Sequence, residues 1–416
     1  MSKIELMKGS FIIALTIKLI VQFYLSWRNM KNINRHKDNV PARFTSKITL
    51  EEHQKAASYS ISKEKLGLFF LLIETIVLLA YTFGGGFNLM ASKSLLLFPH
   101  TLTFQAMGLF AIYSLISLII GIPESLYSTF VLEEKYGFNK TTYKTFFVDF
   151  IKQISLGLLI GVPIFLGLVH IMRGLGDYWW LWGFVFTMSI QFVLLWAYPS
   201  IIAPIFNKFS PLEDGEVKDK IMDLANRTDF NCDGIFIMDA SKRSSHGNAY
   251  FTGLGKKKRI VFFDTLIKIL TPDQIEAVLA HELGHFKKKH ILKGIMKGAI
   301  SSFIGFFVLG VLSQSQWFYF GLGVSYPSEY MALILFTNII SIYTFFLIPI
   351  NSFFSRKHEF EADAFAAKFS NSKELVDALI AMYKDNASTL TPDPVYSKFY
   401  HSHPPAFERI SHLETI

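Results

Sequence analysis

Long apolar stretches, separated by polar segments, dominate the pattern of this chain. Each stretch carries at most one Lys, Arg, Asp or Glu and is long enough for a helix that crosses a bilayer. Lys18 interrupts the first stretch, and no small-residue cleavage site follows before Arg28, so we expect a span there and not a cleaved signal peptide. The pattern predicts seven transmembrane helices, near residues 9–27, 66–84, 103–123, 153–172, 179–204, 294–315 and 331–350.

The composition agrees with a membrane protein. Of the 416 residues, 51% are hydrophobic and 42 are Phe, which is too apolar for an ordinary soluble domain of this length. Buried helices of a large soluble core do not account for so many uncharged stretches. We therefore expect the lipid bilayer as a partner.

Lysine and arginine are distributed unevenly among the segments between these spans. The first, third and fifth connecting segments and the C-terminal tail are basic, whereas the second has only Lys93, the fourth only Arg173 and the sixth neither residue type. Basic residues favour the cytosolic side, so we expect these basic segments and the tail in the cytosol and the N-terminus on the opposite side. This bias accounts for the net charge of +8, and no nucleic-acid partner is needed to explain it. Cys232 is the only cysteine, which excludes a disulfide framework.

The fifth connecting segment carries the pattern of a zinc protease. Thr271 can cap a helix whose first turn contains Gln274, and the two residues form a capping box. Further along this helix stand His281-Glu282-Leu-Gly-His285. Because side chains four residues apart share a helix face, His281 and His285 can bind one metal ion while Glu282 stands beside it as a general base.

A hydrolytic zinc site needs a third protein ligand and an open fourth position for water. Glu359 is the candidate for that ligand, on a predicted helix after the last span. Asp363 lies one turn further, where its carboxylate can accept the free ring N–H of a ligand histidine. Glu361 is offset by about 200° and is expected to face elsewhere. His290 and His358 do not share a helical phase with the neighbouring ligand, so we expect neither to bind the metal.

The fifth segment, about 208–290, is expected to fold as a small α+β unit against the membrane. Residues 235–238 and 258–263 have the composition of strands. A strand edge beside the zinc helix can hold an extended substrate through backbone hydrogen bonds, and Asn248 and Ala249 are the candidates for that edge. A purely structural hairpin is the alternative.

The motifs, taken in order, resemble a known family. They are His281-Glu-Leu-Gly-His285, Ser355-Arg-x-x-Glu359-x-x-Ala-Asp363, His403-Pro-Pro-x-x-Glu408-Arg409, and the segments 134–142 and 247–265. This set is similar to the integral-membrane CAAX prenyl proteases of type 1, the Ste24 family of zinc metalloproteases. No ligand or base is replaced, so we expect an active enzyme.

The resemblance implies further roles. In that family the segment that matches His403 to Arg409 approaches the zinc, which implies that His403 and Arg409 donate to the oxyanion or to a substrate carboxylate. A C-terminal helix cap is the alternative for this pair. The resemblance also implies a chamber enclosed by the spans. Lys18, Glu74 and Asp149 lie in or at the edges of spans and either line such a cavity or extend to an interface.

We therefore expect a multi-span α-helical membrane protein with a small α+β zincin-like catalytic unit. Residues 1–207 should hold five spans, 208–293 the catalytic segment, 294–350 two more spans, and 351–416 the third ligand and the substrate contacts. One Zn²⁺ per chain would lower the pKa of a bound water to about 7. Glu282 would take the proton of that water and return it to the leaving amine.

The resemblance implies release of the last three residues of a prenylated CAAX motif. An HtpX-like protease that removes damaged membrane proteins is one alternative. A zinc sensor or transporter without catalysis is another, although Glu282 speaks against it because a sensor needs no base. The chain ends Leu413-Glu-Thr-Ile, without a dilysine retrieval signal, which favours a bacterial plasma membrane over the endoplasmic reticulum.

Overall fold

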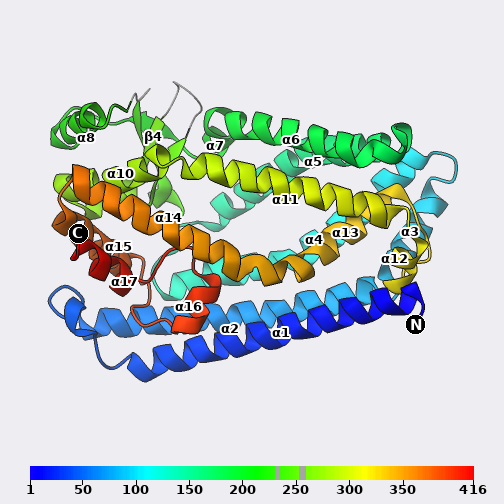
Figure 1. Ribbon diagram of the computed structural model, residues 1–416, viewed down its shortest axis with the longest axis horizontal. Coiled ribbons are helices and arrows are strands. Elements are labelled where there is room, and N and C mark those ends of the chain that lie inside the picture. Colours follow the sequence, from blue (N-terminus) through cyan, green and yellow to red (C-terminus); the bar gives the residue numbers. More distant parts are fainter. Residues whose placement is uncertain (231–233, 253–258) are drawn as a thin grey trace.

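The computed structural model describes residues 1–230, 234–252 and 259–416, and long helices that run side by side make up most of it (Figure 1). The helices are α1 (Lys3–His36), α2 (Leu50–Tyr81), α3 (Gly86–Leu97), α4 (Leu102–Tyr127), α5 (Tyr143–Gly174), α6 (Trp179–Ala197), α7 (Ala203–Phe206), α8 (Glu216–Arg227), α9 (Asp264–Ile269), α10 (Pro272–Lys287), α11 (His290–Ser313), α12 (Gln316–Gly321), α13 (Glu329–Thr344), α14 (Ile348–Phe369), α15 (Ser372–Asp385), α16 (Pro394–Tyr400) and α17 (Ala406–Leu413). The strands are β1 (Phe209–Pro211), β2 (Ile235–Met238), β3 (Ala249–Thr252) and β4 (Arg259–Phe263).

Several of these helices are long and apolar enough to cross a membrane. They are Leu102–Glu133, Tyr143–Gly174, Gly176–Phe206, His290–Ser313 and Glu329–Phe369. Helices α2 and α3, bent by 56° at their junction, count as a sixth candidate if they form one broken span. The described residues thus give five or six candidate spans where the hydrophobic pattern predicts seven. The difference is the predicted span 9–27, which lies within the 34-residue helix α1 and is not among the candidates.

Helix α13 lies at the centre of the membrane region. Half of its apolar window is buried inside the protein, compared with 11–17% for the other four candidate spans. Its buried side chains belong to the same hydrophobic core as Phe11 of α1, Phe87 of α3, Leu109 of α4 and Val169 of α5. The outer helices therefore present most of their apolar surface to the lipid, as a multi-pass protein requires.

A short 3-10 turn, Phe345–Leu347, joins α13 to α14, so one helical segment leads from the membrane core to the residues around Glu359. This segment runs without interruption across residue 350, where the hydrophobic stretch ends. The third predicted ligand is therefore held by a helix whose other end is fixed in the core of the bundle.

The sheet at the opposite end from the N-terminus has the strand order β1-β2-β4-β3. Strands β2 and β4 are parallel, and β1 and β3 pair antiparallel with them. The two strands predicted from composition are confirmed, although Lys258 at the predicted start of the second lies outside the described residues, as does Cys232. Ile260 and Phe262 of β4 pack against α8, α9, α10 and α15 in a second hydrophobic core. This core fixes α10 against the sheet, with β3 at the edge.

Asp149 has different surroundings from Lys18 and Glu74, the two other ionisable residues in or near predicted spans. Asp149 of α5 accepts hydrogen bonds from Arg243 Nε at 2.7 Å and Nη2 at 3.0 Å, and Arg243 also donates to the carbonyl of Phe206. Asp149 therefore anchors the catalytic unit to a membrane helix. Lys18 and Glu74 instead line a cavity of about 380 Å³ between α1, α2, α4 and α13.

The basic segments lie together at the end of the molecule that carries the sheet (Figure 1). Arg43, between α1 and α2, forms an ion pair of 2.7 Å with Glu414 in the tail. Asn139, between α4 and α5, forms a β-bridge with Ser244 of the fifth segment. The N-terminus and α12 lie at the other end of the long helices. The segments that the charge pattern assigns to one side of the membrane thus share one end of the structure.

Candidate metal centre

Helix α10 begins as its sequence predicts. Thr271 Oγ1 accepts from the backbone N–H of Gln274 at 3.3 Å, and the Gln274 side chain accepts from the N–H of Thr271 at 3.1 Å. Ile275, Leu279 and Leu283 bury one face of the helix in the second hydrophobic core. The opposite face, which carries His281 and His285, is thereby turned toward α14.

A glycine allows α10 and α14 to touch through their backbones. A Cβ atom on Gly284 would lie 2.9 Å from the Cα of Ala362, closer than real Cβ contacts, and 3.0 Å from its carbonyl oxygen. Ala362 is itself fully buried. The small residues at this crossing bring Glu359, one turn before Ala362, opposite the two histidines.

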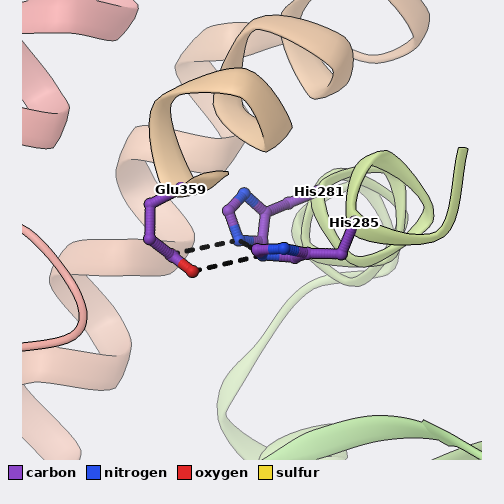
Figure 2. Close-up of side chains that lie close together, drawn as sticks. All are labelled: His281, His285 and Glu359. Carbon is purple, nitrogen blue, oxygen red and sulfur yellow. Dashed lines mark hydrogen bonds and ion pairs between the residues drawn. The ribbon is translucent and has the colours of Figure 1, made fainter. Parts of the chain in front are cut away.

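Three ligand atoms converge at this crossing (Figure 2). The Nε2 atoms of His281 and His285 lie 3.2 Å apart, and Glu359 places its oxygens 3.5 Å from the first and 3.2 Å from the second. Tetrahedral zinc ligands at 2.0–2.1 Å from the ion are about 3.3–3.4 Å from one another. The 3.2 Å between the two Nε2 atoms is close to that value, as are the distances from Oε2 of Glu359 to His281 and from Oε1 to His285. Among the residues that the structure describes, no other such cluster of His, Cys, Asp or Glu has ligand geometry.

The carboxylate of Glu359 gives a second sign of the same fit. Its Oε2 atom is buried and has no well-formed hydrogen bond, although Nδ1 of His403 lies 2.8 Å away. A buried carboxylate oxygen is costly unless a cation or a donor completes its surroundings. A metal ion between Glu359 and the two histidines would add a cation to these surroundings.

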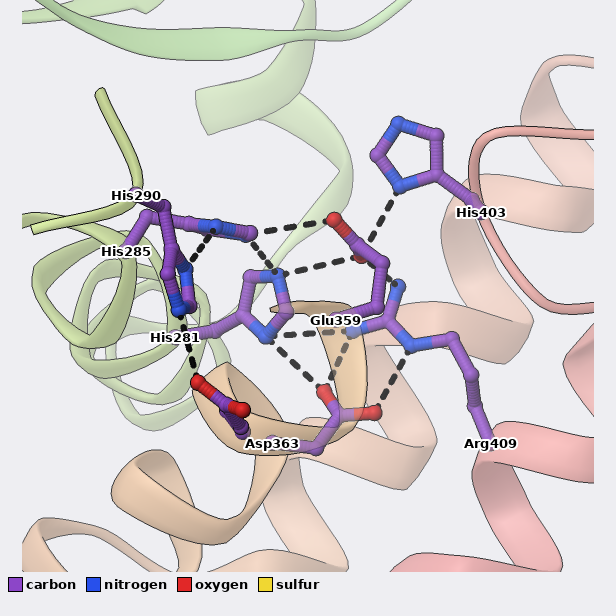
Figure 3. Close-up of polar contacts among 8 residues, drawn as sticks. His281, His285, His290, Glu359, Asp363, His403 and Arg409 are labelled. Atoms are coloured by element: carbon purple, nitrogen blue, oxygen red, sulfur yellow. Dashed lines mark hydrogen bonds and ion pairs between the residues drawn. The ribbon is translucent and has the colours of Figure 1, made fainter. Parts of the chain in front are cut away.

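Asp363 contacts His281 at Nδ1, the ring nitrogen that faces away from the metal position. Its Oδ1 lies 2.8 Å from Nδ1 of His281 (Figure 3), where the sequence predicts such a carboxylate. Since an ionised carboxylate only accepts, we assign the Nδ1–H tautomer to His281, which leaves the Nε2 lone pair for a metal.

Arg409 of α17 completes this support. Its Nε and Nη2 atoms lie 2.9 Å and 2.5 Å from the two oxygens of Asp363. Burial by itself would lower the pKa of Arg409, but the ion pair with Asp363 outweighs it and raises the pKa, so the guanidinium stays charged. Arg409 also lies 3.6 Å from Glu359. It is inside α17 and therefore does not act as a C-terminal cap.

Changing Asp363 to Asn is expected to accelerate zinc release to a chelator about 10–100-fold, because His281 loses the charged acceptor that fixes its tautomer. The melting temperature should fall as well, since the buried Arg409 loses its counter-charge. Release is followed with a colorimetric chelator well below the melting temperature. An unchanged release rate would contradict the role of Asp363.

The remaining predicted residues, except Ala249, line one cleft. A cavity of about 500 Å³ is bordered by His281, Glu282, Asn248, His403 and Arg409, among others. Glu282 is partly exposed there and has no hydrogen bond or ion pair with any described residue, so its carboxylate is available to water. The His403 side chain is 66% exposed, in the turn before α17. Asn248 precedes the edge strand β3, and Ala249 begins it without lining the cavity.

The cleft edge rests on the segment 134–142 that the sequence singles out. Phe138 stacks on the ring of His246 with centroids 4.4 Å apart, and Gly137 takes a left-handed φ of 81° in the turn before it. On the other side, Asn386 accepts from the N–H of Gly247 at 3.2 Å. These contacts fix the chain just before Asn248.

Two residues near the centre have a place that the sequence did not predict. His290 and Glu361 are not among the three ligands, as expected, and Glu361 points away from the metal position, toward His290. Nδ1 of His290 lies 3.0 Å from Nδ1 of His285, and Nε2 of His290 lies 3.0 Å from Glu361. His290 reaches His285 because the helix breaks at Lys289, whose φ is 58°. No signal in the sequence pattern pointed to this break.

Two family descriptions match nearly the whole chain. Residues 29–208 match "CAAX prenyl protease N-terminal, five membrane helices", and residues 211–416 match "Peptidase family M48". The CAAX prenyl protease 1 of Saccharomyces cerevisiae is 35% identical, over 94% of this chain and 92% of its own length. The homolog from Arabidopsis thaliana is 34% identical over 96% and 95%, and the human homolog 36% identical over 75% and 74%.

A solved structure shares the fold. The crystal structure of S. mikatae Ste24p matches with a TM-score of 0.89 and 33% sequence identity, over 99% of each chain. The similarity therefore covers the membrane helices and the metal centre alike.

Proposed function

This chain belongs to peptidase family M48 and to its CAAX prenyl proteases, and we propose that it cleaves prenylated substrates near their C-terminus, with His281, His285 and Glu359 as the ligands of one zinc ion. It is a zinc-dependent endopeptidase of the membrane. The observation that carries the proposed site is the set of three ligand atoms at zinc-like separations, beside a free Glu282 in a cleft.

The chain's own residues divide the chemistry. Zinc, when bound, supplies a Lewis acid that lowers the pKa of water to about 7. Glu282 accepts the proton of the attacking water and delivers it to the amine of the leaving peptide. His403, exposed beside Glu359, donates to the oxyanion that develops on the peptide carbonyl. Arg409 donates a hydrogen bond to Asp363, so its primary role in this proposal is to support His281 through Asp363, and direct contact with substrate is secondary.

The substrate would bind along the edge of the sheet. Strand β3 pairs on one side with β4, and Asn248 at its start faces the cleft. An extended peptide added there would use backbone hydrogen bonds and would pass Glu282 and the metal position. Proximity of Asn248 and Ala249 to the cleft supports both as substrate-binding residues.

A prenylated peptide with a free C-terminal CAAX sequence tests the substrate class. We expect mass spectrometry to detect the released tripeptide, with a clear loss of kcat/KM when the prenyl group is omitted. The control is the same peptide with its scissile peptide bond replaced by an N-methyl amide, which should not be cleaved. Equal cleavage of unprenylated, unfolded membrane proteins would favour the quality-control alternative and contradict the proposal.

The orientation in the membrane follows from the basic segments. These segments gather at the end of the molecule that carries the metal centre, which supports a site that opens to the cytosol. The relatives named above come from yeasts, a plant and human, so they give no support to the expected bacterial plasma membrane.

Thiol labelling in intact cells tests this orientation. In a chain with Cys232 replaced by Ser, a single Cys at Ser325 is expected to react with a membrane-impermeant reagent. A Cys at Ser210 or Ser402 should react only after the membrane is opened. All three positions are exposed in the structure, so a missing reaction reports the membrane and not burial. Labelling of Ser210→Cys in sealed cells would put the metal centre on the outer face.

A further inference from the structure

The two histidine ligands are supported from behind in different ways. His281 meets a carboxylate directly, at Asp363. His285 meets a second histidine, His290 (Figure 3), and His290 in turn meets Glu361. The three residues come from three helices, α10, α11 and α14, and form a continuous row of polar contacts of 3.0 Å.

The direction of these hydrogen bonds is fixed by the ligand atom. His285 points Nε2 at Glu359, so a metal-binding ring must carry its proton on Nδ1. His290 must then accept at its own Nδ1 and carry its proton on Nε2. Glu361, as a carboxylate, accepts that proton's hydrogen bond. Only this arrangement satisfies every atom in the row when His285 is a ligand.

We infer that His290 and Glu361 are positioning residues for zinc, which hold His285 in the Nδ1–H tautomer and fix the direction of its Nε2 lone pair. This inference rests on the proposed zinc site, and it assigns a role to two residues that contact neither substrate nor the metal position. Outer partners of ligand histidines set ring orientation and ligand basicity, and removing one typically costs 10–100-fold in metal affinity or activity.

The surroundings of His290 suit this role. Its ring is buried and stacks on the ring of His358 with centroids 4.0 Å apart and an interplanar angle of 12°. Lys289 has a left-handed backbone conformation, and α11 begins directly after it with His290, whose ring lies against that of His285. His285 needs such support more than His281, because its side chain is 21% exposed and that of His281 only 7%. Water could otherwise compete for its Nδ1–H.

Zinc release from the full-length, zinc-loaded protein tests the inference without measuring peptide cleavage. His290→Phe keeps the ring that stacks on His358 but removes both nitrogen atoms. We expect it to release zinc to a chelator about 10–100-fold faster than the wild type. Glu361→Leu should release zinc faster as well, whereas Glu361→Gln, whose amide oxygen still accepts from His290, should stay close to the wild-type rate.

His358→Phe is the matched control, because it changes the stacked neighbour and leaves the row of hydrogen bonds intact. Its release rate should equal that of the wild type. Measurements well below each variant's melting temperature separate ligand orientation from unfolding, and the Leu and Gln variants of Glu361 carry the test if His290→Phe does not fold.

Wild-type release rates in both His290→Phe and Glu361→Leu would overturn the inference, and so would equal acceleration in the Leu and Gln variants of Glu361. A wild-type protein that binds no zinc would overturn the proposed metal centre instead. The two failures are therefore distinguishable.

Discussion

Peptide turnover is expected to fall by about 10²-fold or more when Glu282 is replaced by Gln, while zinc stays bound. The amide cannot take the proton of the attacking water, yet Glu282 is not one of the three ligands. It lies beside them in the cleft with no described partner, so the exchange should disturb no other contact. The measurement pairs kcat for a prenyl-peptide with zinc content by elemental analysis.

Glu276→Gln provides the control for this variant. Glu276 lies on the same helix and pairs with Arg227, and a Gln there still offers an oxygen to the guanidinium. Turnover should be unchanged in this control. Near-normal turnover in zinc-replete Glu282→Gln protein would remove Glu282 from the mechanism and revive a binding-only function.

Replacing Glu359 with Ala should abolish both zinc binding and turnover. The two histidines alone leave a metal with too few protein ligands, and Glu359 supplies the only carboxylate that faces both Nε2 atoms in the described structure. Zinc content should fall from about one per chain to near zero. Full occupancy in this variant would contradict the ligand set and point to Glu361 or His358.

The parts of the site that depend on local sequence could be predicted. The cap at Thr271, the spacing of His281 and His285, and the turn between Glu359 and Asp363 all follow from helix geometry. Each concerns residues on one helix, whose relative directions are fixed by 3.6 residues per turn.

Contacts between helices could not be predicted in the same way. The direct pairing of Arg409 with Asp363 depends on where α17 docks, and the row from His285 to Glu361 depends on a break at Lys289 that no periodicity announces. Helical phase gives the direction in which Glu361 points from its own helix, but it does not identify the neighbouring helix that packs on that side.

The membrane region shows a similar limit. Hydrophobic length found the five candidate spans from residue 102 onward and part of the bent α2–α3 pair. The predicted span within α1 is not among these candidates, although α1 buries Phe11 and Leu15 in the bundle and exposes Ile13, Ile17 and Ile20.

Metal add-back tests most directly that this protein is a zinc peptidase whose site is His281, His285 and Glu359. The purified protein is stripped with a chelator and titrated with zinc while prenyl-peptide cleavage is measured. The account predicts no cleavage without metal and full recovery at about one zinc per chain, with no recovery in Glu359→Ala. Cleavage that persists in the stripped wild type, or that returns equally in Glu359→Ala, would contradict it.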